Sequence, residues 1–208
     1  MKRSGGIRPL NSHDQKEFVS LMATAFAEDP LFLTLLPASK CRKKAAAALA
    51  GFVFAQGICT NADSWGRFEN GELIGAYLMS KPVPPAAWNL LKGLPALTTS
   101  FIKLLIEFSF SGIKKLNQYY IVTRKTISDD PCHYLVKVGV KPEQQGKGIG
   151  AELIQHAIKR CTSCSLSIGI ALDTENECNI LFYERLGFQQ IHTLQLGKLD
   201  VYCFFYRL

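Results

Sequence analysis

The 208-residue sequence lacks several features that would assign a protein to a class at once. It contains no block of about five or more like charges, so a basic tail for nucleic acid is not expected. It shows no internal repeat and no low-complexity segment. Its first residues are polar and do not form the apolar stretch of a secretory leader. These absences favour one globular domain that binds no nucleic acid.

Cysteine occurs seven times, but the pattern lacks what a disulfide framework or a zinc site needs. Disulfide frameworks use an even number of cysteines. Cys161 and Cys164 form a single C-x-x-C pair, and no second pair stands at zinc spacing. We therefore expect reduced thiols, no metal and a cytoplasmic location.

Long apolar runs are also scarce. Residues 45–62 carry no charge, but Gly51, Gln56 and Gly57 interrupt a stretch that is mostly alanine. A buried core helix explains this composition better than a membrane span does. No membrane is expected as a partner.

What the sequence does have is an apolar, aromatic and basic composition. Hydrophobic residues make up 48%, with 13 Phe and 7 Tyr, which is typical of a folded core. Lys and Arg number 24 against 17 Asp and Glu, for a formal charge of +7. We expect an anionic partner. Two basic clusters, at residues 40–44 and at Lys114 and Lys115, have no assignment from the sequence.

Periodicity and turn residues predict an α/β (α+β) fold, in which a mixed sheet of strands is flanked by helices. Asn70-Gly71 is a strong hairpin signal between two strands. A helical insertion of about residues 82–130 follows the third strand, and Gly93-Leu94-Pro95 and Ser111-Gly112 are expected to divide it into pieces. Strands are expected at 7–10, 64–69, 72–80, 134–140, 165–172, 189–195 and 201–207, and helices at 12–28, 31–36, 41–59, 150–160 and 174–186.

Residues 145–150 form a glycine-rich turn between a strand and a helix, which suits a phosphate group. A Walker loop is excluded because Gly148 stands where Ser or Thr would hold magnesium. A dinucleotide fingerprint fits Gly146, Gly148 and Ala151, with Asp173 as the ribose acid. However, residues 141–145 separate the strand from the glycines, whereas the dinucleotide turn starts directly after its strand.

The whole stretch V-G-V-K-P-E-Q-Q-G-K-G-I-G at 138–150, followed by Asn179 and F-Y-E-R-L-G-F at 182–188, resembles the GNAT superfamily of acetyl-CoA-dependent N-acetyltransferases. The family's Gln/Arg-x-x-Gly-x-Gly/Ala motif is met by Gln145, Gly148 and Gly150. The segment A-F-A-E-D-P-L-F at 25–32 and the insertion are similar to the puromycin-type antibiotic acetyltransferases. The resemblance implies one GNAT-like domain over residues 1–208, a mostly antiparallel sheet of about seven strands, and a cofactor-binding core at about 133–188.

The resemblance also implies the site. Acetyl-CoA would be a co-substrate, its phosphates on the glycine turn and its pantetheine arm along a strand that splays from its neighbour. It is expected to contact Val138, Gly139, Val140, Gln145, Gly146, Lys147, Gly148, Ile149, Gly150, Ala151, Asn179 and Tyr183. Lys141 and Lys147 are expected to screen the phosphate charge.

Direct attack by an amine needs an acid for the departing thiolate and a route for the proton of the ammonium. Tyr183 is the predicted general acid, because a phenol can donate to a thiolate of lower pKa. Asn179 stands one helical turn earlier and shares its face. The strand beside the thioester carries no acid, so Glu28 and Asp29 are the candidate bases, with His133 next.

The leading functional hypothesis is acetyl transfer from acetyl-CoA to a primary amine of a small molecule, in a ternary complex of a monomer or homodimer. One alternative is a non-catalytic acyl-CoA sensor or interaction module. A second is acetylation of a protein or peptide amine. A nucleic-acid-binding module, suggested only by charge, is the third.

Overall fold

The computed structural model describes residues 5–36, 40–83, 87–127 and 130–208, without the side chains of 88–92 and 126–127. The strands are β1 (Gly6–Pro9), β2 (Asp63–Glu69), β3 (Glu72–Ser80), β4 (His133–Val140), β5 (Gly169–Thr174), β6 (Gln189–Leu196) and β7 (Leu199–Arg207). The helices are α1 (Gln15–Ala25), α2 (Pro30–Leu35), α3 (Arg42–Thr60), α4 (Ala87–Glu107), α5 (Phe110–Ile127), α6 (Ile149–Cys161) and α7 (Ile180–Arg185).

Among these residues, the strands form one seven-stranded sheet in the order β1-β2-β3-β4-β5-β7-β6. Every neighbouring pair is antiparallel except β4 and β5, which are parallel. The predicted fold class, a mixed and mostly antiparallel sheet of about seven strands, is confirmed. The helical insertion after the third strand is also confirmed, since α4 and α5 connect β3 to β4.

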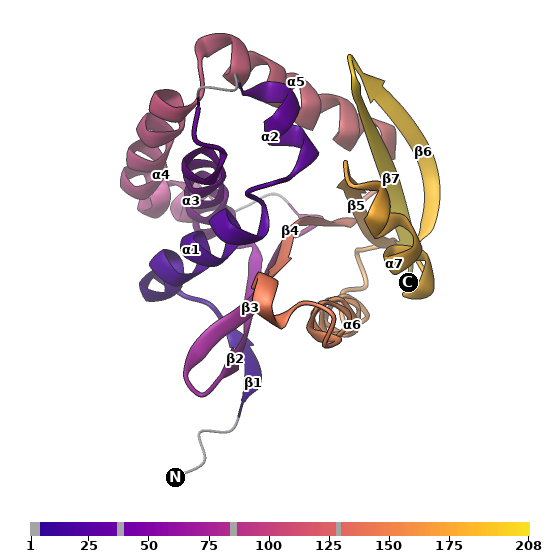
Figure 1. Cartoon of the computed structure of the whole chain (residues 1–208). Helices are drawn as coiled ribbons and strands as arrows, with labels where there is room; N and C mark the ends of the chain where they lie inside the picture. Colours follow the sequence, from indigo (N-terminus) through magenta and orange to yellow (C-terminus); the bar gives the residue numbers. More distant parts are fainter. Residues whose placement is uncertain (1–4, 37–39, 84–86, 128–129) are drawn as a thin grey trace.

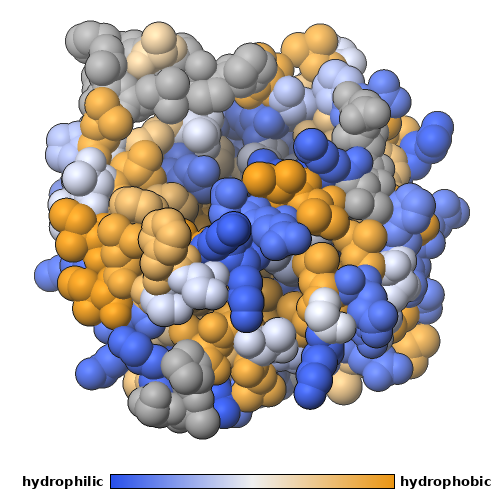
Figure 2. All heavy atoms as spheres, turned by 90° about the horizontal axis from the view of Figure 1, so that it is seen from above, coloured by the Kyte–Doolittle hydropathy of each residue, from blue (hydrophilic) through white to orange (hydrophobic). Residues whose placement is uncertain are grey.

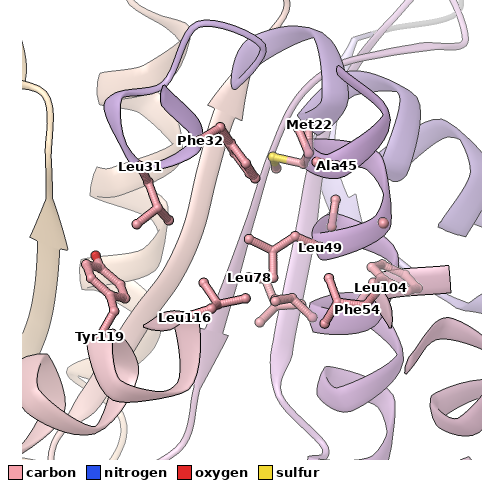
Figure 3. Close-up of a cluster of buried hydrophobic side chains, with 14 of the residues drawn as sticks. Met22, Leu31, Phe32, Ala45, Leu49, Phe54, Leu78, Leu104, Leu116 and Tyr119 are labelled. Atoms are coloured by element: carbon pink, nitrogen blue, oxygen red, sulfur yellow. The ribbon is translucent and has the colours of Figure 1, made fainter. Parts of the chain in front are cut away.

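Helices cover both faces of the sheet (Figure 1). Side chains of β3 alternate between two buried clusters, with Leu73 and Leu78 in one and Ile74, Tyr77 and Met79 in the other. The first cluster includes residues of α1 to α5, and Figure 3 shows several of them gathered around Leu78. The second is filled by α6 and α7. The sheet is therefore the middle of three layers.

Two expected boundaries are wrong. The sequence placed breaks in the insertion at Gly93-Leu94-Pro95 and at Ser111-Gly112, but α4 continues through Pro95 and ends at Glu107. Gly93 lies directly against Cys59 of α3, so packing of the two helices outweighs the local effect of proline. The strand expected at 165–172 runs instead over Gly169–Thr174.

No single helix in the described ranges is long and apolar enough to cross a membrane. Two consecutive segments, Gly93–Glu107 and Phe110–Lys125, meet the length and composition test only as a pair, and they are bent by 117°.

Candidate active site

The parallel strands β4 and β5 pair only at their first residues. The partners are His133 with Ile170 and Tyr134 with Ala171. Beyond them β4 continues to Val140 and β5 to Thr174 without further pairing between the two. The divergence leaves backbone groups of both strands open to a ligand. In an α/β sheet, the carboxyl ends of parallel strands are a common binding place.

A cavity of about 700 Å³ occupies this opening. Its walls come from the end of β4, the glycine turn, the start of α6, the end of α1 and helix α7. The lining residues predicted from the sequence are Val138, Gly139, Val140, Gln145, Gly146, Gly148, Ile149, Gly150, Ala151, Asn179, Tyr183 and Asp29. The turn and the F-Y-E-R segment, far apart in the chain, thus meet at one site.

The glycine turn has the backbone that its sequence requires. Gly146 and Gly148 have φ angles of 76° and 82°, in the left-handed region that favours glycine. No atom lies within 4 Å of where a Cβ would stand at either position. Gly148 is also the N-cap of α6, so free N–H groups of the first helical turn face the cavity. Gln145 donates from Nε2 to the carbonyl of Val140, at 3.1 Å, and ties the turn to β4.

The basic residues near the turn differ from the expectation. Lys147 is exposed, donates to Oε1 of Gln144 at 2.9 Å, and does not line the cavity. Lys141 pairs with Glu72. Arg185, in the last turn of α7, also lines the cavity and was not predicted from the sequence. Its signal was the F-Y-E-R-L-G-F motif, in which it follows the tyrosine by two positions.

Tyr183 is buried on α7 with its ring among Phe182, Phe188 and Phe204, at centroid distances of 5.2, 5.8 and 5.6 Å. Burial, reinforced by nearby carboxyls, raises the pKa of its phenol. The hydroxyl therefore keeps its proton at neutral pH. Asn179 precedes α7 as its N-cap residue and donates from Nδ2 to Oγ1 of Thr174 at 3.1 Å, which links α7 to the end of β5.

A second cavity, of about 80 Å³, adjoins the first. The two share Phe26, Asp29, Val138, Asn179 and Tyr183. Its further lining residues are Leu31, Tyr119, Tyr120, Tyr134, Leu135, Val136, Lys137, Leu172, Asp173, Thr174 and Glu175. Aromatic side chains and three carboxyls therefore surround a small space beside Tyr183.

Asp173, one of these carboxyls, lies on β5. The hydroxyls of Tyr119, from α5, and Tyr134, from β4, both donate to it. Burial, with Glu175 and Asp29 nearby, raises the pKa of Asp173 well above its usual range. The insertion thus contributes directly to this cavity through α5.

Glu175 and Asp29 complete the acidic group. Burial and the neighbouring carboxyl of Asp29 raise the pKa of Glu175 to about 7, against the opposing charge of Lys137. Burial also raises the pKa of Asp29, with Lys137 again opposing. Asp29 caps α2, where its Oδ1 accepts from the N–H of Leu31 at 2.9 Å. A carboxyl that titrates near pH 7 suits proton transfer.

Two of the candidate bases lie away from this space. The side chain of Glu28 is 83% exposed, pairs with Arg42 at 3.2 Å, and lines neither cavity. His133 is buried at the first residue of β4, where Nδ1 lies 2.8 Å from Oγ of Ser167. The sequence analysis did not consider Glu175, and it weighed Asp173 only as a ribose ligand. The signal was present, since Asp173 lies near the carboxyl end of β5 and Glu175 follows directly after it.

A comparison with known protein families decides the assignment. The profile described as the acetyltransferase (GNAT) family matches residues 47–188, which is more than half of the chain. The chain belongs to the GNAT acetyltransferase family.

Solved structures show the same fold across nearly the whole chain. A Corynebacterium glutamicum protein described as histone acetyltransferase HPA2 and related acetyltransferase superposes with a TM-score of 0.70 at 19% identity, covering 98% of this chain and 96% of that one. A Drosophila melanogaster polyamine N-acetyltransferase gives 0.59 at 15%, covering 99% and 100%. Arabidopsis thaliana NAA60, solved with acetyl-CoA, gives 0.53 at 18%, covering 99% and 100%.

This GNAT protein is an N-acetyltransferase that uses acetyl-CoA, and its residues fit that co-substrate. The glycine turn leaves N–H groups uncovered at one end of the larger cavity, where a pyrophosphate suits them. The open edge of β4 offers backbone partners for an amide-containing arm. When bound, acetyl-CoA supplies an acetyl group activated as a thioester. Separately, no group of three or more metal-ligating side chains occurs in the described parts of the chain.

Proposed function

We propose that this GNAT acetyltransferase transfers the acetyl group to a primary amine of a small molecule. The observation that carries the proposal is the junction of the two cavities at Asp29 and Tyr183. One cavity has the room and the turn for acetyl-CoA, and the other offers about 80 Å³ enclosed by carboxyls and aromatic rings. A compact alkylammonium matches both the negative charge and the aromatic faces.

Glu175 is the base in this proposal. Acetyl transfer forms an N–C bond and breaks a C–S bond, so the amine nitrogen must lose a proton and the sulfur must gain one. Glu175 shares the small cavity with Asp29, and its pKa of about 7 allows it to take a proton at neutral pH, directly or through one water. This assignment replaces Glu28 and His133. Asp29 then serves to bind the ammonium and to hold the pKa of Glu175 high.

Tyr183 is the acid in this proposal. It lines both cavities, and its raised pKa keeps the phenol protonated as a hydrogen-bond donor for the departing sulfur. The unpaired edge of β4, from Val136 to Val140, supplies backbone donors for the carbonyl oxygen of the thioester. One preorganised donor of this kind contributes about 3 kcal/mol to lowering the barrier.

The proposal also covers the size of the acceptor, the cellular compartment and the oligomeric state. Phe26 and Asp29, from the segment similar to puromycin-type acetyltransferases, also line the small cavity proposed for the amine, which supports a small-molecule acceptor. All seven cysteines are free thiols, which supports a reducing compartment such as the cytoplasm. The expected oligomeric state is a monomer or a homodimer.

The test is a thiol-release assay with acetyl-CoA and a panel of alkylamines, aminoglycosides and peptides with a free amino terminus. We expect turnover with compact alkylamines, and at least about a hundredfold less after Glu175→Gln. Turnover with peptides only would replace the small-molecule proposal with protein acetylation. A thermal shift with acetyl-CoA but no turnover on any amine would indicate a sensor.

A further inference from the structure

The outer side of α4 carries an apolar surface that the fold does not cover. The helix turns Gly93, Ser100 and Leu104 inward, and these positions recur at helical spacing. Around the rest of the helix, Leu94, Phe101, Ile102, Leu105 and Ile106 are exposed, although the ring of Phe101 also lies 5.9 Å from that of Phe52 of α3. Phe110, the first residue of α5, extends this surface around the bend between the two helices.

The exposure is unusually high for such side chains. Phe110 is 85% exposed, Ile106 65% and Ile102 53%. Single exposed apolar residues are ordinary, whereas a contiguous group marks a surface that meets another apolar phase. Figure 2 shows hydrophobic side chains gathered on the left of the molecule, the side on which α4 lies in Figure 1. We call the surface formed by Leu94, Phe101, Ile102, Leu105, Ile106 and Phe110 the apolar edge.

Exposed cations border the apolar edge. Lys103 lies one turn before Ile106 on α4, and Lys114 stands one turn after Phe110 on α5. Lys115 follows it. Nζ of Lys40 donates to the carbonyl of Ile106 at 3.2 Å, which brings the other basic cluster to the same end of α4.

Acidic residues are scarce there. Over residues 93–125, the described part of the two helices, Glu107 is the only acidic residue against five Lys and Arg. Lys40 precedes α3, and Lys43 and Lys44, both exposed, lie in the first turn of that helix. The two basic clusters that the sequence left unassigned therefore lie around one apolar surface.

We propose that the apolar edge docks on an anionic lipid surface. An interfacial helix combines a broad apolar side with flanking lysines, so that side chains enter the acyl boundary while the cations meet acidic headgroups. A second copy of this chain fits less well, because a symmetric pair would bring like-charged lysine clusters together. Glu107 is the only acidic residue at positions 93–125 of α4 and α5 that could offset their charge. The proposal reverses the sequence-based expectation that no membrane takes part.

The surface lies on the same insertion as Tyr119 and Tyr120, which line the small cavity. It is nevertheless separate from the larger cavity, since none of its six residues lines that space. Acetyl-CoA binding therefore provides an independent check that a variant of the apolar edge is folded. It also separates failure of this proposal from failure of the proposed reaction.

The experiment is cosedimentation of the full chain with vesicles of phosphatidylcholine alone and of phosphatidylcholine mixed with phosphatidylserine. We expect binding to the mixed vesicles that weakens as salt is raised, and much less binding to the neutral ones. Ile106→Gln with Phe110→Gln should lower the bound fraction by at least about tenfold. Lys114→Gln with Lys115→Gln should weaken binding to the mixed vesicles and reduce its salt dependence.

Matched controls lie elsewhere on the molecule. Leu166→Gln replaces a side chain that is 63% exposed in the loop before β5, and Lys198→Gln removes an exposed cation between β6 and β7. Both should bind vesicles like the wild type. The proposal is overturned if mixed vesicles do not bind at low salt, or if the control variants lose binding equally. It is also overturned if the wild type is a dimer that Ile106→Gln with Phe110→Gln dissociates while vesicle binding stays unchanged.

Discussion

At the scale of single residues, the protonation of Glu175 should govern turnover. The base must be ionised to accept a proton, and burial with Asp29 nearby places its pKa at about 7. We expect kcat/KM to rise as the pH increases through about 7 and to level off above it. Glu175→Gln should lower kcat by about a hundredfold or more and remove that limb.

Glu28→Gln is the matched control, because Glu28 is an exposed carboxyl paired with Arg42. Its pH profile should coincide with that of the wild type. If kcat/KM of Glu175→Gln rose with pH as it does in the wild type, the titrating group would not be Glu175. Asp29 would then be the next candidate.

Gly148 tests the glycine turn in isolation. With φ at 82° and no neighbour near a Cβ, Gly148→Ala costs about 1 kcal/mol of backbone strain without a steric clash. Because the strain moves the N–H groups at the start of α6, we expect a higher KM for acetyl-CoA and little change in kcat.

Gly197→Ala provides the comparison. Gly197 has φ of 69° and open space around its Cβ position, but it lies between β6 and β7, away from both cavities. It should lose similar stability in a urea titration and keep the wild-type KM. Equal changes in KM for the two variants would mean that general destabilisation, not the turn, weakens acetyl-CoA binding.

At the scale of secondary-structure elements, α5 is joined to the sheet by a buried hydroxyl. Tyr119 donates to Asp173 of β5, so Tyr119→Phe leaves a buried carboxyl with one donor fewer. We expect unfolding to require about 1 to 3 kcal/mol less free energy. If α5 shapes the acceptor cavity, KM for the amine should rise more than KM for acetyl-CoA.

Tyr206→Phe, on β7, is the control for loss of a tyrosine hydroxyl. It should leave the ratio of the two KM values unchanged. A Tyr119→Phe enzyme with wild-type stability and KM values would show that α5 only covers the sheet.

The sequence predicted the helices and strands better than it predicted where they begin and end. The position of Asp173 and Glu175 depends on one of these boundaries, that of β5. The run from Ser165 to Ile168 has an alternating pattern typical of a strand, so β5 was expected to begin there. In the structure β5 begins at Gly169, where its pairing with Arg207 of β7 begins, and β4 joins one residue later at Ile170. Pairing partners fix strand boundaries, and a single segment carries no information about them.

The glycine turn was predictable for the opposite reason. Gly146 and Gly148 hold left-handed backbone, which glycine adopts most readily, so the local sequence alone predicts the turn. The small cavity instead combines Asp29 from the N-cap of α2, Tyr119 from α5 and Glu175 after β5. Only the fold brings these three together, and burial in this space raises the pKa values of Asp29 and Glu175.

At the scale of the whole molecule, two sets of groups make stability depend on pH in opposite directions. Burial lowers the pKa of His133 and His156 below the ordinary 6.5. As the pH falls below about 6.5, the unfolded chain takes up protons that these folded histidines refuse, so the folded state is destabilised. The raised pKa values of Asp173 and Glu175 act the other way, since the folded carboxyls bind protons before the unfolded ones do.

His156→Gln tests the contribution of one histidine to the pH dependence of the unfolding free energy. His156 lies on α6 with Nδ1 3.0 Å from the hydroxyl of Tyr77 and its ring 4.7 Å from that of Trp65. Near pH 8 the variant should be less stable than the wild type, because these contacts are weakened. Because the pKa of the half-buried His156 is lowered, the wild type loses stability from this residue as the pH falls through about 6.5. The variant does not, so the gap in unfolding free energy should narrow.

Urea titrations at several pH values between about 5 and 8 measure this gap directly. His192→Gln, at an exposed position of β6, is the matched variant, and its curve should run parallel to that of the wild type. A gap for His156→Gln that stayed constant over this range would contradict the argument. The loss of unfolding free energy at lower pH would then be assigned to His133. This residue lies where β4 and β5 pair, at the point from which the two strands diverge.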